Sequence, residues 1–361
     1  MSYLYYFLRK IAYAFSVLFG VVTLLFILFN CMSGDPAQMM LGQQENTEQL
    51  QHIRKKFGFD KPLTTQYAYY LNDLSPISFH STMPDDFTFY NSAIYSGWVL
   101  FQIQKTAVVL KRPYLRISYH KNQKRVSEII WETFPNTVLL AVVSIGFALC
   151  IGITLGVITA VIQGHFLDKF VQFFSILGMS LPSFFSAILT AWIFGFLWHN
   201  YTGLPMSGSL YEIDDFGRGK YIAWKNLILP AFVLGIRPLA VIIQLTRGSV
   251  LDVLHLDYVR TAKAKGISRF QILYKHVLKN ALNPVVTAVS GWFASMLAGA
   301  VFVEYIFGWN GMGKEIVNAL NFLDLPVIMG IIIVISGCFV ILTILVDFLY
   351  RYLDPRVQIK G

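Results

Sequence analysis

The amino-acid sequence predicts an all-α polytopic membrane protein. Of its 361 residues, 55% are hydrophobic and only 14% are charged, and the mean hydropathy of +0.56 is one that soluble domains rarely reach. Several apolar runs exceed the roughly 20 helical residues that cross a bilayer. A net charge of +9 would suggest nucleic-acid binding in a soluble protein. Here basic loops at a lipid surface explain it better, so we expect membrane lipid and no nucleic acid as a partner.

Six apolar segments are predicted to span the membrane. They cover residues 11–29, 137–162, 170–198, 227–245, 285–302 and 326–350. The first is interpreted as a retained span and not as a signal peptide, because it is long for a signal h-region and no small-residue cleavage site follows it. An even number of spans places both termini on the same side, which we predict to be the cytoplasm.

These spans divide the chain into four parts. We predict an N-terminal tail with the first helix (1–32), an external loop or small subdomain (33–130), a transmembrane domain (131–355) and a cytoplasmic tail (356–361). Gly34-Asp35-Pro36 is typical of a turn that leaves the membrane. Within the external part, residues 47–57 predict a short amphipathic helix and residues 98–110 are β-prone.

Small residues recur at every fourth position in two of the predicted spans. In the second span they are Ser144, Ala148, Gly152, Gly156 and Ala160, and in the fifth they are Thr287, Gly291, Ser295 and Gly299. Such faces allow helices to approach closely in lipid, so we interpret both as packing faces. Pro135 is expected to open the second span, and Pro182, followed by Ser183, to kink the third. The kink is either structural or a gating hinge.

A polar, basic island lies between the fourth and fifth spans. Asp257 is a suitable N-cap for a first short helix, and Gly266 stands where a helix end turns left-handed. Ser268 with Gln271 forms the pattern of a capping box that opens a second helix. Ile267 and Ile272 occupy the positions of a hydrophobic staple, and one apolar stripe is predicted from Phe270, Leu273, Tyr274, Val277 and Ala281.

Charge alone would allow this island to be an ordinary basic cytoplasmic loop. Paired caps and an apolar stripe, however, require a surface on which to pack. We therefore interpret the helix–glycine–helix elbow, within a loop at 251–283, as a docking element for a soluble partner.

The island resembles the cytoplasmic coupling loop of ABC-importer permeases, in particular the first permease of dipeptide, oligopeptide and nickel importers. The matching residues are Asp257, Tyr258, Val259, Arg260, Thr261, Ala262, Ala264, Lys265, Gly266, His276, Leu278, Asn280, Ala281, Leu282 and Pro284. The resemblance covers roughly residues 1–70 and 115–356. Where the family usually carries Asp-Leu-Gly-x-Ser-Tyr, this chain has Leu115-Arg116-Ile117-Ser118-Tyr119.

The resemblance implies the fold of a type I importer permease that forms half of a heterodimeric pore. It implies as partners a homologous second permease, two ABC ATPase subunits and an external solute-binding protein. The chain itself would catalyse nothing and bind no cofactor, because ATP and magnesium belong to the ATPases. Peptides are the expected cargo, with nickel chelate, glutathione or murein peptide as alternatives. A secondary transporter driven by an ion gradient is a more remote alternative, for which Asp347, interpreted as a local ion pair with Arg351, is a poor relay.

Other candidate sites are rejected on the sequence. Gly308, Gly313 and Lys314 imitate a phosphate-binding loop, but Glu315 follows where a Ser or Thr should hold magnesium. The three cysteines have no metal-ligand or disulfide spacing, and we expect no metal site. Glu304 and Asp324 are interpreted as solvated ends of spans.

Arg237 is the remaining candidate for the pore. It lies about ten residues into the fourth span, where a charge costs roughly 2.5–3.5 kcal/mol on insertion scales. It either bonds carbonyls freed by Pro238, pairs with an acid on the partner permease, or lines the pore and binds an anionic group such as a peptide carboxylate.

Overall fold

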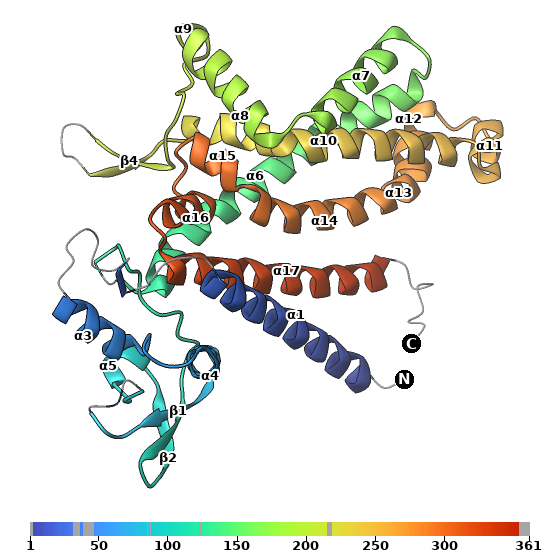
Figure 1. Ribbon diagram of the computed structural model, residues 1–361. Coiled ribbons are helices and arrows are strands. Elements are labelled where there is room, and N and C mark those ends of the chain that lie inside the picture. Colours follow the sequence, from blue (N-terminus) through green and yellow to red (C-terminus); the bar gives the residue numbers. More distant parts are fainter. Residues whose placement is uncertain are drawn as a thin grey trace. The chain divides into compact units, whose positions relative to one another are not determined.

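The structure is a computed structural model that describes residues 3–31, 37–38, 47–84, 86, 88–122, 124–214 and 219–353 (Figure 1). The predicted turn at Gly34-Asp35-Pro36 and the C-terminal Asp354-Pro355-Arg356 lie outside these residues, as do the side chains of Asp347 and Arg351. Contacts divide the chain into two compact units. The first comprises Met1–Glu132 and Glu315–Val334, and the second comprises Thr133–Lys314 and Ile335–Gly361.

The first unit joins a long apolar helix to a small mixed subdomain. Its elements are α1 (Tyr3–Cys31), α3 (Thr47–Phe57), α4 (Leu63–Leu74), β1 (Ile77–Ser81), α5 (Ser92–Tyr95), β2 (Trp98–Ile103) and β3 (Thr106–Leu110). The strands form an antiparallel sheet in the order β1-β3-β2. The predicted helix at 47–57 and the predicted β-structure at 98–110 are thereby confirmed.

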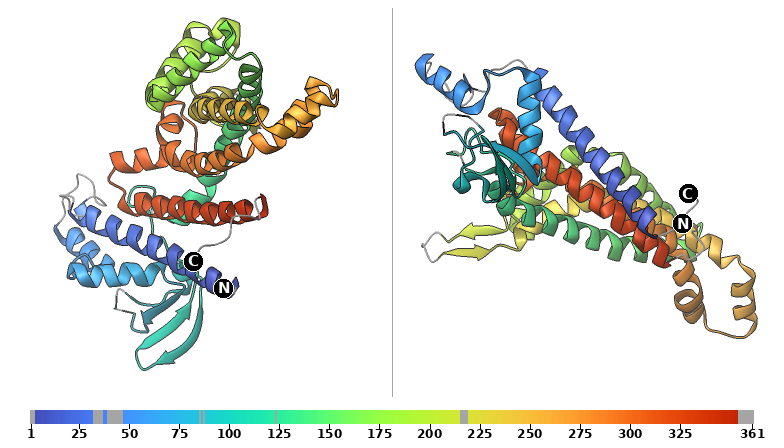
Figure 2. Two further views of the ribbon diagram at one scale, coloured as in Figure 1. Left: turned by 90° about the vertical axis from the view of Figure 1, so that its right-hand side faces the viewer. Right: turned by 90° about the horizontal axis from the view of Figure 1, so that it is seen from below.

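Helix α4 connects the sheet to α1. The Tyr67 hydroxyl lies 2.6 Å from Thr23 Oγ1, and the rings of Tyr67 and Tyr70 pack on Phe26. At the other end of α4, the Asn72 amide exchanges two hydrogen bonds with the backbone of Phe79 in β1. Figure 2 shows α4 between α1 and the sheet.

The second unit is a bundle around one long helix. Its elements are α6 (Val126–Val161), α7 (Phe166–Ser180), α8 (Ser183–Thr190), the π-helix η1 (Ala191–Leu197), α9 (His199–Thr202), β4 (Tyr211–Ile213), β5 (Lys220–Ile222), α10 (Lys225–Leu254), α14 (Asn283–Gly299) and α15 (Val301–Ile306), together with the elbow described below. Helix α10 packs against α7, α8 and α14, as Figure 1 shows. Helices α6, α16 (Met312–Asn321) and α17 (Leu325–Leu353) belong partly to each unit.

Two helices extend beyond the spans that the sequence predicts. Helix α6 begins at Val126, so Pro135 lies inside the helix and does not open it. The additional turns form because Val126, Ile129 and Ile130 are buried. Helix α10 likewise continues to Leu254, beyond the predicted end at residue 245, because Val250 and Val253 are buried at its end.

The third predicted span is two helices and not one kinked helix. Helix α7 ends at Ser180, α8 begins at Ser183, and the pair is bent by 110°. Leu181 is extended, with φ −75° and ψ 132°, because the residue before a proline is excluded from the helical region by clash with the proline ring. Pro182 is extended as well, so the helix is interrupted for two residues.

The predicted count of six spans is not confirmed. Among the described residues, four helices are long and apolar enough to cross a membrane, or five if the bent pair is one span. These four are Leu8–Asn30, Val126–Val161, Lys225–Leu254 and Leu325–Val346. The fifth predicted span consists of the 17-residue α14 and the separate, short α15.

The small-residue face of the second predicted span packs as expected. A Cβ added to Gly152 would lie 2.7 Å from Ile242 Cγ2, and one added to Gly156 would lie 2.6 Å from Thr246 Cβ. Both neighbours belong to α10, so the two helices are closer there than any larger residue allows. On the corresponding face of α14, Gly291 and Ser295 are exposed, and no described atom lies within 4 Å of the Cβ position of Gly291.

Glu304 and Asp324 are buried, so their interpretation as solvated ends is wrong. Glu304 Oε2 accepts hydrogen bonds from the backbone nitrogens of Gly313, at 2.6 Å, and Lys314 at the start of α16. Asp324 accepts from the Ser118 hydroxyl and from the Tyr119 backbone nitrogen. Each carboxylate satisfies backbone donors of a turn that would otherwise be buried without partners.

The contact between α6 and α10 yields the first prediction. Gly156→Val should lower the melting temperature of the purified chain, because overpacking typically costs about 1–3 kcal/mol. Gly146→Val is the matched control: the same change in the same helix, at a glycine with no neighbour within 4 Å of its Cβ position. Equal melting temperatures for the two variants would contradict the close-packing role.

Candidate functional site

The first helix of the elbow is α11 (Asp257–Ala264), and its start corrects the predicted cap. Leu256 is the N-cap residue, with φ −72° and ψ 148°, and no side chain caps the helix. Asp257 is instead the first helical residue, where a carboxylate favours the positive end of the helix dipole. The predicted cap is one residue too late. The turn that follows α10 occupies only His255 and Leu256, so the next helix already begins at Asp257.

The turn between the two helices has the predicted geometry. Gly266 has φ +73°, the left-handed region that glycine adopts without steric cost. Ser268 is the N-cap of α12 (Arg269–Ile272), and its hydroxyl accepts a hydrogen bond from the backbone nitrogen of Gln271. The left-handed turn and this half of the predicted capping box are confirmed.

The predicted apolar stripe divides into two surfaces. Helix α12 passes into a π-helical turn, η2 (Leu273–Val277), and then into α13 (Leu278–Ala281). A π turn accommodates an additional residue and therefore rotates the side chains that follow it. Val277 and Ala281 are buried, whereas Phe270 is 76% and Tyr274 67% exposed.

The buried surface gives the elbow a hydrophobic core of its own. This core joins the ends of α6 and α10 to α11, α12, η2 and α13. Its buried members are Ala160, Val250, Val253, Val259, Ala262, Ile272, Val277 and Ala281. Ile267 and Leu278 pack against it, half-buried. The elbow is thereby attached to two long helices of its own chain, at one end of α10 (Figure 2).

Three of the predicted site residues form a hydrogen-bonded link across the elbow. Asn280 Nδ2 donates to the Tyr258 hydroxyl at 2.8 Å, and that hydroxyl donates to the backbone carbonyl of His276 at 3.3 Å. The link connects α11 to η2 and α13, which are 18–22 residues further along the chain. The three residues thereby hold the two halves of the elbow together.

The exposed surface of the elbow is aromatic and basic. Phe270 and Tyr274 are surrounded in sequence by exposed cations: Arg260, Lys263, Lys265, Arg269, Lys275 and Lys279. Asp257 is also exposed and lies 3.6 Å from Arg260. Thr261 and Ala264 are exposed beside them. Two large exposed rings within a ring of charge are typical of an interaction surface.

An ion pair beside the elbow could not be predicted from the sequence. Arg247 donates to both oxygens of Asp168, from Nε at 2.8 Å and from Nη2 at 2.9 Å. Asp168 also accepts from the backbone nitrogen of Gly164. This bidentate pair attaches the start of α7 to the last part of α10, just before the elbow. The residues are 79 positions apart, so only the fold brings them together.

The candidate gate residues lie on helices that pack against each other. Pro182 and Ser183 stand at the break between α7 and α8. One turn earlier, a Cβ on Gly178 would lie 3.0 Å from Ile236 Cγ2, next to Arg237 in α10. The Arg237 side chain is exposed and makes no hydrogen bond or ion pair with any other described residue. The predicted bond to carbonyls freed by Pro238 is therefore not made.

The turn that imitates a phosphate loop has a structural explanation. Lys314 Nζ donates to the carbonyl oxygen of Gly308 and to Asn310 Oδ1. Its ammonium is thus used within the turn. In the part of the chain that the structure describes, no three His, Cys, Asp or Glu residues are grouped as metal ligands.

Among the described residues, four helices long and apolar enough to cross a bilayer mark the chain as a polytopic membrane protein. The family of binding-protein-dependent transport system inner membrane components matches residues 152–359. The N-terminal model of the same membrane components matches residues 3–77. The chain belongs to this family and is a transport subunit of the inner membrane.

Individual relatives agree with the family. The dipeptide transport system permease protein DppB of Alkalihalophilus pseudofirmus is 31% identical over 98% of this chain and 99% of that protein. A chain of the methionine ABC transporter MetNI, solved in inward-facing conformations, has a similar fold. That likeness has a TM-score of 0.51 at 15% identity and covers 63% of this chain and 97% of the other. The type I importer permease fold is thereby confirmed.

The hydrogen-bonded link yields the second prediction. Tyr258→Phe should accelerate amide hydrogen exchange in α11 by up to about tenfold, because a net hydrogen bond contributes roughly 0.5–1.5 kcal/mol. Tyr274→Phe is the control, since that hydroxyl makes no hydrogen bond to another described residue. Unchanged exchange in Tyr258→Phe would show that the link does not hold the elbow together.

Proposed function

We propose that this chain is one permease of an ATP-driven importer of di- and oligopeptides. It forms half of the translocation pore with a homologous second permease. Two ABC ATPase subunits bind it from the cytoplasm, and an external solute-binding protein delivers the cargo. The proposal is supported by the family and by a relative, named as a dipeptide permease, to which this chain is similar over the whole length.

The observation that carries the coupling role is the divided surface of the elbow. One side is packed on the ends of α6 and α10, and the other presents Phe270, Tyr274 and the basic residues. A push on the exposed side is transmitted to two membrane helices because the buried side is close-packed. ATP and magnesium act on the ATPase subunits, and this chain supplies the docking surface.

Charge and topology favour the same orientation. The elbow carries six exposed cations and is expected on the cytoplasmic side. Both termini are then cytoplasmic. The exposed small-residue face of α14 around Gly291 and Ser295 suits close contact with the second permease.

Peptide cargo is distinguished from the alternatives by experiment. Nickel chelate, glutathione and murein peptide would use the same machine with a different binding protein. The ligand of that binding protein identifies the cargo. A secondary transporter belongs to another class, and uptake into vesicles that requires ATP and resists ionophores excludes it.

The turn at Gly266 yields the third prediction. Gly266→Val should abolish ATP-driven uptake and reduce co-purification of the ATPase subunits, because a β-branched residue does not tolerate φ +73°. Gly248→Val is the control, at a helical glycine with no neighbour within 4 Å of its Cβ position. Survival of both uptake and assembly in Gly266→Val would show that the coupling role is wrong.

Arg237 yields the fourth prediction. Its guanidinium has no partner among the described residues, and a charge in a span requires one, either an acid on the second permease or an anionic cargo group. If it lines the pore, Arg237→Met should assemble and hydrolyse ATP normally but lose transport of peptides with a free carboxylate, while C-terminally amidated peptides are affected less. If it pairs with the second permease, the same variant should assemble poorly. Normal assembly and normal transport of both peptide types would reject both roles.

A further inference from the structure

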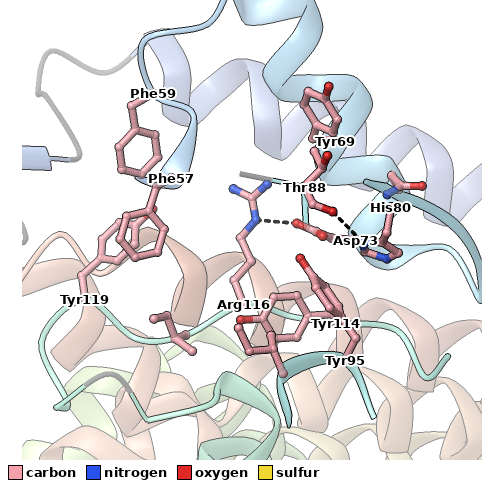
Figure 3. Close-up of a pocket in the computed structure, with 13 residues that line it drawn as sticks. Phe57, Phe59, Tyr69, Asp73, His80, Thr88, Tyr95, Tyr114, Arg116 and Tyr119 are labelled. Carbon is pink, nitrogen blue, oxygen red and sulfur yellow. Dashed lines mark hydrogen bonds and ion pairs between the residues drawn. The ribbon is translucent and has the colours of Figure 1, made fainter. Parts of the chain in front are cut away.

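The first unit contains a pocket of about 170 Å³ between α4 and the small sheet (Figure 3). One side is formed by the rings of Phe57, Phe59 and Tyr119, and the other by Tyr69, Thr88 and His80. Drug-sized ligands usually occupy about 300–1,000 Å³. This pocket therefore suits a molecule no larger than a single amino acid.

One cation and one anion face the pocket as a pair. Arg116 Nε donates to Asp73 Oδ2 at 3.0 Å, and the two side chains are only 30% and 13% exposed. Among the described residues, neither terminal nitrogen of Arg116 and neither lone pair of Asp73 Oδ1 has a hydrogen-bond partner. The pocket thus offers unused N–H donors beside an unused carboxylate oxygen.

The backbone holds this arginine in an unfavourable conformation. Arg116 has φ +65°, a region that non-glycine residues rarely adopt. It is fixed there because its carbonyl accepts from the Val126 nitrogen, and because Ser118 and Tyr119 are bonded to Asp324. Strained residues concentrate at ligand-binding positions. A glycine at this position would adopt the same backbone conformation without strain. The strain is therefore tolerated for the sake of the arginine side chain.

The other polar groups of the pocket are neutral or already used. Burial raises the pKa of Tyr114 and of Tyr119 to about 12, so both phenols remain protonated. Burial and the nearby Lys111 lower the pKa of His80, whose two ring nitrogens lie within hydrogen-bond distance of Ser78 and Thr88. Lys111 does not line the pocket, and its ammonium donates to the Asp73 backbone carbonyl. The lining therefore presents one positive and one negative charge against aromatic walls.

We propose that this pocket binds a free α-amino acid with an apolar side chain. The carboxylate accepts from the terminal nitrogens of Arg116, the ammonium donates to Oδ1 of Asp73, and the side chain packs against the rings of Tyr95, Tyr114 and Tyr69. In an α-amino acid the two charges are separated by one carbon, which matches a protein acid and base in direct contact. A dipeptide separates them by several further bonds and exceeds the volume. The proposed ligand is a free amino acid and not the peptide cargo of the importer.

The test is calorimetric titration of the purified full-length chain in lipid nanodiscs with L-leucine as the probe. Saturable binding is expected. Leucinamide lacks the carboxylate, 4-methylpentanoate lacks the ammonium, and leucyl-leucine is too large, so each should bind at least tenfold more weakly. Equal binding of 4-methylpentanoate and leucine would replace the amino acid with a simple carboxylate and overturn the proposal. No saturable binding with leucine up to 10 mM, a concentration about ten times the upper end of ordinary KM values (about 1 mM), would also overturn it.

Three variants place the binding in the pocket. Arg116→Gly keeps the left-handed backbone without strain and should lose leucine binding. Ile94→Trp leaves the ion pair in place and should block the pocket, since Ile94 lines it and is 41% exposed. Ile103→Trp, at an exposed residue that does not line the pocket, is the control and should bind normally. Wild-type affinity in Ile94→Trp, with an unchanged melting temperature, would show that leucine binds elsewhere.

Discussion

The close contact of α6 with α10 is the interaction on which the second unit depends. Lipid offers no hydrophobic gain when two apolar helices meet, so their association rests on packing and on close approach. Gly152 and Gly156 bring α6 against Ile242 and Thr246 without room for a side chain. Gly235 of α10 repeats the device further along, where an added Cβ would lie 2.9 Å from the Ser144 carbonyl oxygen.

The elbow extends this rigid pair into the region where a soluble partner is proposed to bind. Its core includes Ala160 at the end of α6 and Val250 and Val253 near the end of α10. The Asp168–Arg247 ion pair adds the start of α7 to the same end. Because three helices are attached close to one elbow, a movement of the elbow cannot be confined to a loop. This arrangement gives a physical basis for the proposed transmission of ATPase motion to the membrane helices.

The subdomain of the first unit is held together by different contacts. Its sheet is joined to α1 through α4, and its loop at 115–119 is held by the buried Asp324. Arg116 has a left-handed backbone at φ +65°, a conformation that glycine adopts without strain. Because Arg116 has this conformation, both its positive charge and its backbone strain lie at one small pocket. Neither family model covers residues 78–151, which is where most of this subdomain lies.

Local patterns were sufficient wherever the cause of a structure was local. The apolar runs, the helix at 47–57, the β-prone stretch, the left-handed Gly266 and the Ser268 cap all depend on a few neighbouring residues, and the sequence by itself determined them. The small-residue face of α6 was also visible, because periodicity reports a helix surface directly.

Only the tertiary structure decided which of these surfaces are used and how charges are paired. The face of α6 packs on α10, whereas on α14 Gly291 and Ser295 are exposed. The π turn at Leu273–Val277 divided a stripe that ideal helical spacing had kept whole. Glu304 is buried where it accepts from the backbone nitrogen of Gly313, and Asp324 where it accepts from that of Tyr119. Arg116 meets Asp73 across 43 residues. Sequence periodicity fixes the direction of a side chain relative to its own helix, but only packing of distant segments determines what that side chain meets.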